Sequence, residues 1–366
     1  MAAYTNIDDP SAHFQTTTYT GAGANTVVTN GGNSDLKPDL LWIKNRTAGY
    51  GHFIVDSNRN ISYAQNSSNA PYLEAEGTSA ENNNQNWMQS VNTDGFTTGI
   101  SEHTNSNSGS AFVAWQWKAN GGTTASNTDG SITTTTQVNS DAGFSIVTWA
   151  GGGTGSLGHG LGVVPDMWIV KNRDYAVSWA VGFSDSSILG GTSNYLQLNT
   201  ANATSTYNNI WGSSPANSST ITMAGDRSVN ISGNDYVGYF FKAKQGYSKF
   251  GKYKGNGNAN GTFTYTGFKP AFVLVKRITN SGYNWRLVDS ARNTFNLTDR
   301  LLMPDSSSAE FDGSTHADNI GMDFLSNGFK QRTSHTALNG SGATYIYMAF
   351  AEHPFVTSTG VPTTAR

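Results

Sequence analysis

Three apolar runs of strand length recur along the chain, each starting shortly after a proline and ending in lysine. They read LLWIK at residues 40–44, MWIVK at 167–171 and FVLVK at 272–276. Branched and aromatic residues bounded by proline and polar turns are typical of β-strands. Because the runs are almost continuously apolar, we expect these strands to be buried on both faces.

The spacing of these motifs predicts three copies of one module. Proline and lysine lie six residues apart each time, and a Ser-Gly turn entering an aromatic strand follows each run. From that proline to that glycine the distances are 71, 68 and 72 residues, and two motifs at nearly constant separation indicate an internal repeat. The repeated positions are Pro38, Lys44, Arg46 and Gly109, then Pro165, Lys171, Arg173 and Gly233, then Pro270, Lys276, Arg277 and Gly342.

The rest of the pattern favours strands over helices. No stretch repeats apolar residues at helical spacing over three turns. The 41 glycines, with abundant Asn, Ser and Thr, suit short strands joined by tight turns. We therefore predict an all-β fold of three tandem, divergent β-sandwich modules with little or no helix, each with about six to eight strands.

The motifs also place the boundaries of the modules. Between modules 2 and 3 we expect almost no linker and a rigid junction, whereas the Gly/Ser/Thr-rich stretch after module 1 reads as a connector with a short strand at 131–137. The predicted segments are an N-terminal arm (1–12), module 1 (13–119), the connector (120–142), module 2 (143–245), module 3 (246–355) and a C-terminal tail (356–366).

Composition excludes several classes of protein. A net charge of −3 argues against nucleic-acid binding, which needs concentrated Lys and Arg. No apolar run is long enough to insert into a membrane. The absence of cysteine removes disulfides and thiol chemistry, and the N-terminal MAAYTNIDDP lacks the pattern of an export signal, so we expect folding in a reducing cytoplasm.

Sequence motifs for catalysis or metal binding are missing. The seven histidines lack metal-site spacing, and there is no serine-hydrolase elbow or phosphate-binding loop followed by a helix. We therefore predict that the protein is not an enzyme and has no catalytic residues, metal site or cofactor. Asp56 and Asp289 follow the repeated lysines at 12 and 13 residues, which we interpret as a structural ion pair between neighbouring strands. A binding groove or a lysine-assisted acid is the functional alternative.

Aromatic residues in the variable middle of the modules are candidates for surface contact. They are Tyr72, Trp87, Tyr207 and Trp211. Stacking on sugar rings is one role and core filling is the other. The turn-rich stretches at 63–87, 189–211 and 303–319 differ most among the copies, so we expect them to carry receptor or neighbour contacts.

The order of the motifs resembles a known family. YTGAG at Tyr19, then KPDLLWIKNR at Lys37, DGF at Asp94 and NSGSAFVAWQWK at Asn107 are similar to a module of marine bacteriophage, cyanophage-like, virion and tail-fibre-like structural proteins. GYSKFGKYKGNG at Gly246 and TYIYMAFAEHPF at Thr344 extend the resemblance over nearly the whole chain. Module 2 departs from it, because it lacks the Asx-Gly-Phe turn.

The resemblance implies a structural protein of the phage virion, made in the host cytoplasm. We expect a tail-associated, fibre or knob-type subunit that acts by surface contact in assembly and adhesion, with head decoration as another position. The implied partners are other virion proteins in a homo-oligomer or symmetric particle, and a host glycan or receptor. A carbohydrate-binding module array and a polysaccharide depolymerase are the alternatives in other functional classes.

Overall fold

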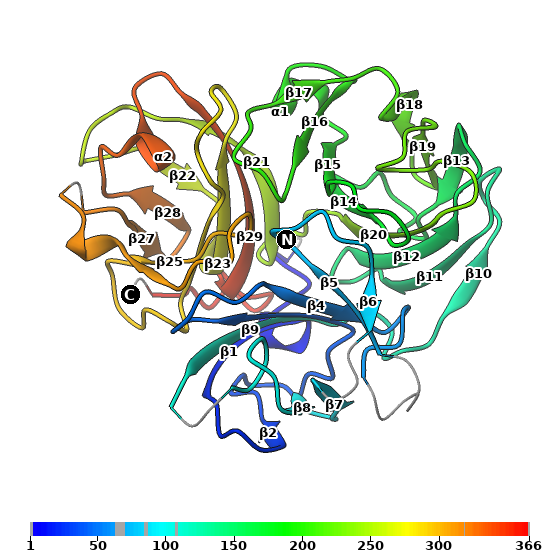
Figure 1. The fold of residues 1–366 in the computed structure, drawn as a ribbon. Coiled ribbons are helices and arrows are strands. Elements are labelled where there is room, and N and C mark those ends of the chain that lie inside the picture. Colours follow the sequence, from blue (N-terminus) through cyan, green and yellow to red (C-terminus); the bar gives the residue numbers. More distant parts are fainter. Residues whose placement is uncertain (1–2, 63–69, 84–86, 107–108, 318, 365–366) are drawn as a thin grey trace.

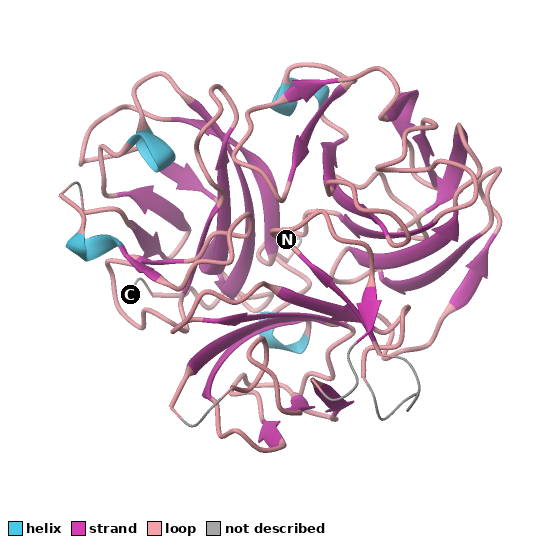
Figure 2. Ribbon diagram, viewed as in Figure 1, coloured by secondary structure: helices cyan, strands magenta, loops and turns pink. Residues whose placement is uncertain are grey.

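Strands build three lobes that surround a common centre (Figures 1 and 2). The computed structural model describes residues 3–62, 70–83, 87–106, 109–317 and 319–364. Within these residues every helical segment is a single turn: η1 (Pro10–Ala12), α1 (Ser186–Leu189), η3 (Gly313–Thr315) and α2 (Thr336–Asn339). The prediction of an all-β fold with little helix is confirmed.

Each lobe contains one main antiparallel sheet, formed by the residues of one predicted module. In module 1 its spatial order is β1 (Phe14–Thr20), β9 (Ala111–Trp117), β3 (Leu40–Asn45), β4 (Phe53–Asp56), β5 (Pro71–Glu74) and β6 (Asn82–Asn83). In module 2 it is β12 (Phe144–Ala150), β20 (Asp235–Phe241), β14 (Met167–Asn172), β15 (Ala180–Phe183), β16 (Asn194–Gln197) and β17 (Ser205–Thr206). In module 3 it is β21 (Ser248–Lys254), β29 (Thr344–Pro354), β23 (Phe268–Arg277) and β24 (Arg286–Asp289).

A smaller three-stranded sheet belongs to each lobe. These sheets are β2 (Thr26–Val28), β8 (Phe96–Thr98) and β7 (Met88–Val91) in module 1; β13 (Gly155–Gly158), β19 (Thr220–Met223) and β18 (Trp211–Ala216) in module 2; and β22 (Phe263–Tyr265), β28 (Gly328–Gln331) and β27 (Met322–Leu325) in module 3. In module 3 the pair β25 (Arg300–Leu301) and β26 (Phe311–Asp312) joins β24 through a bridge between Leu287 and Leu302.

Outside the fifth and sixth strands of each module, the strand pairing is the same in all three lobes. The described residues contain nine strands in each module, β1–β9, β12–β20 and β21–β29, rather than six to eight. In each set the first strand pairs with the ninth, the ninth with the third and the third with the fourth, while the eighth lies between the second and seventh. Corresponding strands therefore share order and direction, although the sequences differ widely.

The predicted connector forms two further strands. β10 (Ala125–Asn127) and β11 (Thr134–Asn139) form a hairpin, and β11 pairs with β12 along Phe144–Thr148. The stretch 120–142 thus extends the main sheet of module 2, with β11 close to the strand expected at 131–137. Threonine-rich sequence is compatible with this, because β-branched residues favour extended backbone.

Alternate residues of the main strands face two different cores. In β3, Leu40 and Trp42 point to a core shared by all three lobes, whereas Leu41 and Ile43 point to the core of module 1 alone. The strands β14 and β23 divide their residues in the same way. This explains the continuous apolar runs, since a strand buried on both faces has no solvent-facing position. Trp42, Trp168 and Val273 are all buried, as expected for these runs.

The shared core contains one aromatic ring from the same position in each lobe. Trp117, Phe241 and Phe350 end the corresponding stretches of β9, β20 and β29. The ring of Phe350 lies 5.6 Å from that of Trp117 and 6.1 Å from that of Phe241, centroid to centroid. The three modules are therefore not independent domains joined by linkers, because each completes its core with residues of the other two.

Candidate functional site

The three repeated lysines are buried at the junctions between lobes. Lys44 Nζ donates to the carbonyls of Asn45 and Ala48 in its own module and to Ser307 O of module 3 at 3.1 Å. The other two lysines follow the same rule. Lys171 Nζ reaches Thr78 O of module 1 at 3.1 Å, and Lys276 Nζ reaches Ala201 O of module 2 at 3.4 Å, each with two carbonyls of its own module. The three lysines thus close a ring of contacts.

Burial changes the titration of these ammonium groups. It lowers the pKa of Lys44, Lys171 and Lys276 from 10.5 to about 8 in each case, and for Lys44 the carboxylate of Glu76 works in the opposite direction. A lowered lysine pKa is also found in catalytic lysines. Here three backbone carbonyls accept from each ammonium, two from its own module and one from the neighbouring lobe.

Two of the repeated arginines form ion pairs across the same junctions. The Arg46 guanidinium binds both oxygens of Glu310 in module 3 at 2.8 Å, and Arg173 binds both oxygens of Glu81 in module 1 at 2.8 Å. Two parallel N–H···O bonds fix both orientation and distance. Sequence reasoning missed Glu81 and Glu310, because they lie in the dissimilar middle of the modules.

The aspartates predicted to pair with the lysines have other partners. Asp56 pairs with Arg59 at 2.6 Å and accepts a hydrogen bond from Tyr239 of module 2. In the same way Asp289 pairs with Arg292 at 2.6 Å and accepts one from Trp115 of module 1. The predicted Lys–Asp ion pair is therefore wrong, because the aspartate lies three residues before an arginine that reaches it within its own turn.

At the junction between modules 2 and 3, uncharged residues stand at the positions of the paired arginine, glutamate and aspartate. Arg277 of β23 lies opposite Tyr345, and Asn45 of β3 lies opposite Phe112 at the same point of its sheet. Arg277 therefore corresponds to Asn45, and the next residue, Ile278, corresponds to Arg46. Thr204 donates its N–H to Ile278 O, as Glu81 does to Arg173 O, so Thr204 stands at the position of the glutamate. Phe183 is the last residue of β15, as Asp56 is of β4, so Phe183 stands at the position of the aspartate. The alignment of Arg277 with Arg46 is thus corrected. Its guanidinium lies over Tyr283 instead.

One more position links each lobe to the next. Trp179 and Trp285 donate from their indole nitrogens to Glu74 O and Gln197 O of the preceding module. In module 1 this position is His52, whose Nδ1 accepts from Trp42 and whose Nε2 lies 3.0 Å from Met303 O. Burial, with the nearby charge of Lys44, lowers the pKa of His52 well below its usual value, which keeps the ring neutral as these two bonds require.

The repeated prolines and glycines have backbone roles. Pro38 and Pro165 are buried just before β3 and β14, whereas Pro270 lies inside β23 at a shift of its register with β29. The three landmark glycines, Gly109, Gly233 and Gly342, adopt φ of 102°, 85° and 70° in the turn before the ninth strand of each module. Glycine reaches this region without strain, which accounts for its recurrence there.

Most of the candidate contact aromatics are not on the surface. Tyr72 and Trp211 are buried in the cores of modules 1 and 2, and Trp87 is half-buried against the ring of His103. Tyr207 is exposed, and a contact role for it stays a prediction. Residues 63–69, 84–86 and 318 of the predicted contact loops lie outside the described residues, while the parts of these loops described above contain Thr78, Glu81, Ala201, Ser307 and Glu310 and bind the neighbouring lobe.

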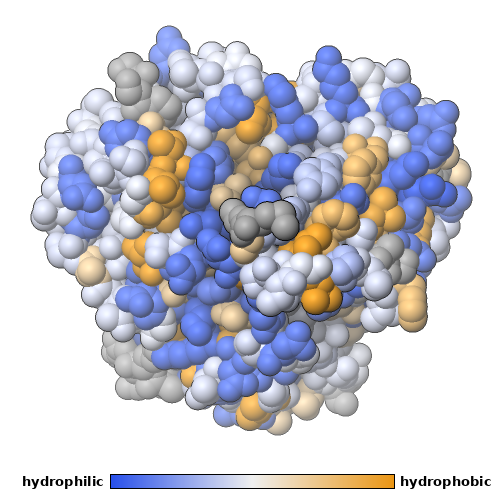
Figure 3. Space-filling model, turned by 180° about the vertical axis from the view of Figure 1, so that it is seen from behind, coloured by the Kyte–Doolittle hydropathy of each residue, from blue (hydrophilic) through white to orange (hydrophobic). Residues whose placement is uncertain are grey.

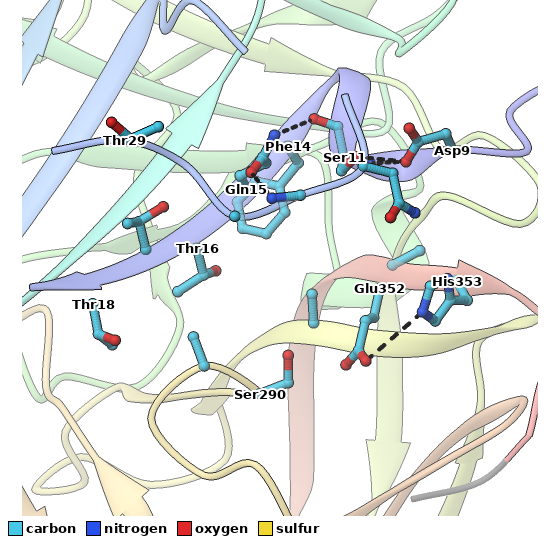
Figure 4. A pocket seen from close by; sticks show the side chains of 17 residues that line it. Asp9, Ser11, Phe14, Gln15, Thr16, Thr18, Thr29, Ser290, Glu352 and His353 are labelled. Atoms are coloured by element: carbon cyan, nitrogen blue, oxygen red, sulfur yellow. Dashed lines mark hydrogen bonds and ion pairs between the residues drawn. The ribbon is translucent and has the colours of Figure 1, made fainter. Parts of the chain in front are cut away.

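A cleft of about 510 Å³ lies between modules 1 and 3 (Figure 4). One wall is the edge of β1, where five consecutive residues, Phe14–Thr18, line the space. Across it lie Ser290, Glu352 and His353 of module 3 (Figure 4). Hydroxyl groups and backbone dominate these walls, so the cleft suits a ligand that makes neutral hydrogen bonds.

The charged groups of this cleft are held by neighbours. Asp9 accepts hydrogen bonds from Ser11 and Ser34, and Glu352 pairs with Lys269 at 3.0 Å. Gln15 accepts from Gly32 N and donates to Ser11 O and Ser34 O. Within the described parts of the chain, three or more His, Asp or Glu side chains do not gather at any point as metal ligands would. None of the helices described there has the length and hydropathy to cross a membrane.

The ion pair at the junction of modules 1 and 2 gives a testable pH dependence. Burial alone raises the pKa of Glu81, but the bonds and charges of Arg173 and Arg59 outweigh it and lower the pKa. The bonds therefore stabilise the fold above the unfolded pKa of the carboxyl and are lost as the pH falls through the lower, folded pKa. We expect Glu81→Gln to lower the free energy of unfolding by about 2 kcal/mol at pH 7 in urea titrations, and by much less at pH 3.

The matched control for this substitution is Asp235→Asn. Asp235 lies 4.0 Å from the same guanidinium of Arg173, but its side chain is 54% exposed. An exposed pair contributes about 0–1 kcal/mol, so this variant should unfold almost like the wild type. Equal losses from the two substitutions at every pH would contradict the role given to Glu81.

The chain belongs to a family described as a domain of unknown function, DUF7483, whose model matches residues 9–354. This match covers the main and small sheets of all three modules, so the family unit is the whole three-lobed body rather than a single module. No curated protein and no solved structure matches the chain.

Proposed function

We propose that this protein is a non-catalytic structural subunit of a bacteriophage particle, acting by surface contact. The observation that carries the proposal is the use of the repeated polar residues. Lys44 and Arg46 lie in a motif that resembles virion proteins, and Lys171, Lys276 and Arg173 lie in its repeats within this chain. Their side chains bind one lobe to the next. A body fixed in this way presents its surface loops in constant relative positions, which suits repeated contacts in a particle.

The surface supports a role in contact. Seen from behind, several apolar patches lie among hydrophilic side chains around the middle of the molecule, where the lobes meet (Figure 3). Exposed large apolar residues include Val27, Tyr265 and Phe295. Removing such side chains from water on binding a partner lowers the free energy of the complex. The proposed partners are other virion proteins and, at a tail or fibre position, a host glycan or receptor.

Electron microscopy of purified particles tests this function. Particles labelled with a gold-conjugated antibody against the chain should carry label at one defined place, with tail or fibre ends expected and the head as the other position. Particles incubated with the same antibody after it has been saturated with the purified, soluble protein serve as the control. Particles that contain all their other proteins but never bind the antibody would contradict the proposal.

A further inference from the structure

The first strand of module 1 has an open edge along the cleft. Among the residues that the structure describes, β1 is the outermost strand of its main sheet and pairs with β9 on one side. A strand paired on one side directs the N–H and C=O of every second residue away from its partner. Five consecutive residues of β1 line the cleft, so the open edge of this strand runs along the cleft.

Module 2 shows how the same edge is covered elsewhere in this chain. Phe14 lies opposite Trp117 as Phe144 lies opposite Phe241, so Phe14–Thr18 correspond to Phe144–Thr148. That stretch of β12 is the one that pairs with β11, from Asn139 opposite Phe144 to Thr135 opposite Thr148. The segment of β1 that lines the cleft therefore corresponds to the segment of β12 that pairs with an additional strand in module 2.

We infer that the cleft between modules 1 and 3 accepts an extended peptide strand from a partner protein, which pairs with β1 as β11 pairs with β12. An added strand forms backbone hydrogen bonds along the open edge, and its alternate side chains meet the cleft walls. The hollow beside the open edge of module 3 is smaller, about 260 Å³, and among the described residues of β21 it is lined by Ser248 and Lys249.

The walls select the chemistry of that strand. Thr16, Thr18 and Ser290 present small hydroxylic side chains (Figure 4). Ala271 and Ala291 also line the cleft, and their side chains are small. The carboxylates of Asp9 and Glu352 already have Ser11, Ser34 and Lys269 as partners. The fitting strand is thus uncharged and rich in Thr, Ser, Asn and Val, like β11 itself. The inference goes beyond the proposed function and holds whether or not the partner belongs to a particle.

A synthetic peptide with the sequence of residues 131–140, SITTTTQVNS, acetylated and amidated at its ends so that it carries no charge, is the probe. We expect saturable binding to the full-length protein in isothermal titration calorimetry. In hydrogen exchange, amides of residues 14–20 should exchange about tenfold more slowly when the peptide is present. The same peptide methylated at alternate backbone nitrogens should lose at least tenfold in affinity, because it cannot donate along the edge.

Ala291→Trp fills the cleft from the opposite wall without changing β1, and it should weaken binding at least tenfold. Ala259→Trp, at an exposed loop position outside the cleft, is its matched control and should bind like the wild type. Thermal unfolding checks that both variants are folded.

Four results would overturn the inference. They are no binding at millimolar peptide, equal binding by Ala291→Trp, equal binding of the methylated peptide, and exchange changes confined to residues 134–150, where the peptide would replace β11. Slowed exchange of β1 on raising the protein concentration alone would make a second copy of this chain the occupant, and would also overturn the proposed partner. A failure of this kind leaves the particle labelling result untouched, so the two proposals are tested separately.

Discussion

Replacing Lys171 by methionine is expected to lower the free energy of unfolding by about 3–5 kcal/mol at pH 7. The ammonium donates to Thr78 O, Asn172 O and Val177 O, and methionine fills similar space without any donor. Buried carbonyls that lose their partner cost about 1–3 kcal/mol each, with partial relaxation reducing the sum. Denaturant titration followed by tryptophan fluorescence measures the loss.

The pH dependence and a control make this prediction specific. Because burial lowers the folded pKa of Lys171 to about 8, the unfolded chain binds more protons than the folded one between pH 8 and 10.5. Wild-type stability should therefore rise with pH in that window by an amount that Lys171→Met lacks. Lys254→Met, at an exposed position of β21, should change stability by less than about 0.5 kcal/mol. A Lys171→Met variant as stable as the wild type would show that the lysine is dispensable at the junction.

Trp168→Ala is expected to cost about 3–5 kcal/mol by emptying the centre of module 2. The indole is fully buried, and it crosses the ring of Trp211 at a centroid distance of 5.4 Å and an angle of 87°. Gly182 lies so close that a Cβ added there would stand 2.5 Å from the indole ring. The backbone of β15 has therefore closed around this side chain, which limits collapse into the cavity.

Two companion variants separate cavity formation from the simple loss of an aromatic ring. Tyr207→Ala removes an exposed ring and should change stability by less than about 0.5 kcal/mol. Trp168→Phe keeps most of the volume and should cost much less than alanine. An unfolding midpoint unmoved by Trp168→Ala would show that the strand is not central to the module.

The sequence was most informative about single strands and turns. Three apolar runs after prolines predicted β3, β14 and β23, and the recurring glycines marked the turns where positive φ is needed. Both signals are local, because side-chain alternation and backbone strain depend on neighbouring residues. The burial of Trp42 and Trp168 on opposite faces of corresponding strands also follows from the alternation, once each sheet is known to have a core on both sides.

The contacts between lobes could not be found in this way. Lys44 meets a carbonyl 263 residues away, and because this contact uses the backbone of Ser307, it does not depend on the identity of that residue. Glu81 and Glu310 lie at different distances from the nearest repeated motif, so alignment of the modules does not reveal them. The Asp-x-x-Arg signal at Asp56 and Asp289 was present in the sequence, but proximity along the chain to the lysines suggested the wrong partner.

The departure of the junction between modules 2 and 3 has a physical reason. Replacing a buried ion pair by apolar side chains of suitable volume is often neutral for stability, whereas removing one partner alone is costly. Ile278, Thr204 and Phe183 together replace the arginine, the glutamate and the aspartate of the other junctions. A buried charge without its partner is thereby avoided. A junction can thus replace the members of its ion pairs while Lys276 and Trp285 still donate to the neighbouring lobe and the strand order stays the same.

The ring of lobe contacts determines when the chain can finish folding during synthesis. A ribosome delivers module 1 first, but Arg46 must wait for Glu310, 264 residues later. Contacts so distant along the chain form slowly, because a long loop must close before they are made. Until then the rings of Phe14 and Trp117 lack the Phe272 and Phe350 that cover them in the finished protein. Nascent chains that stop before module 3 should therefore be the species that chaperones retain.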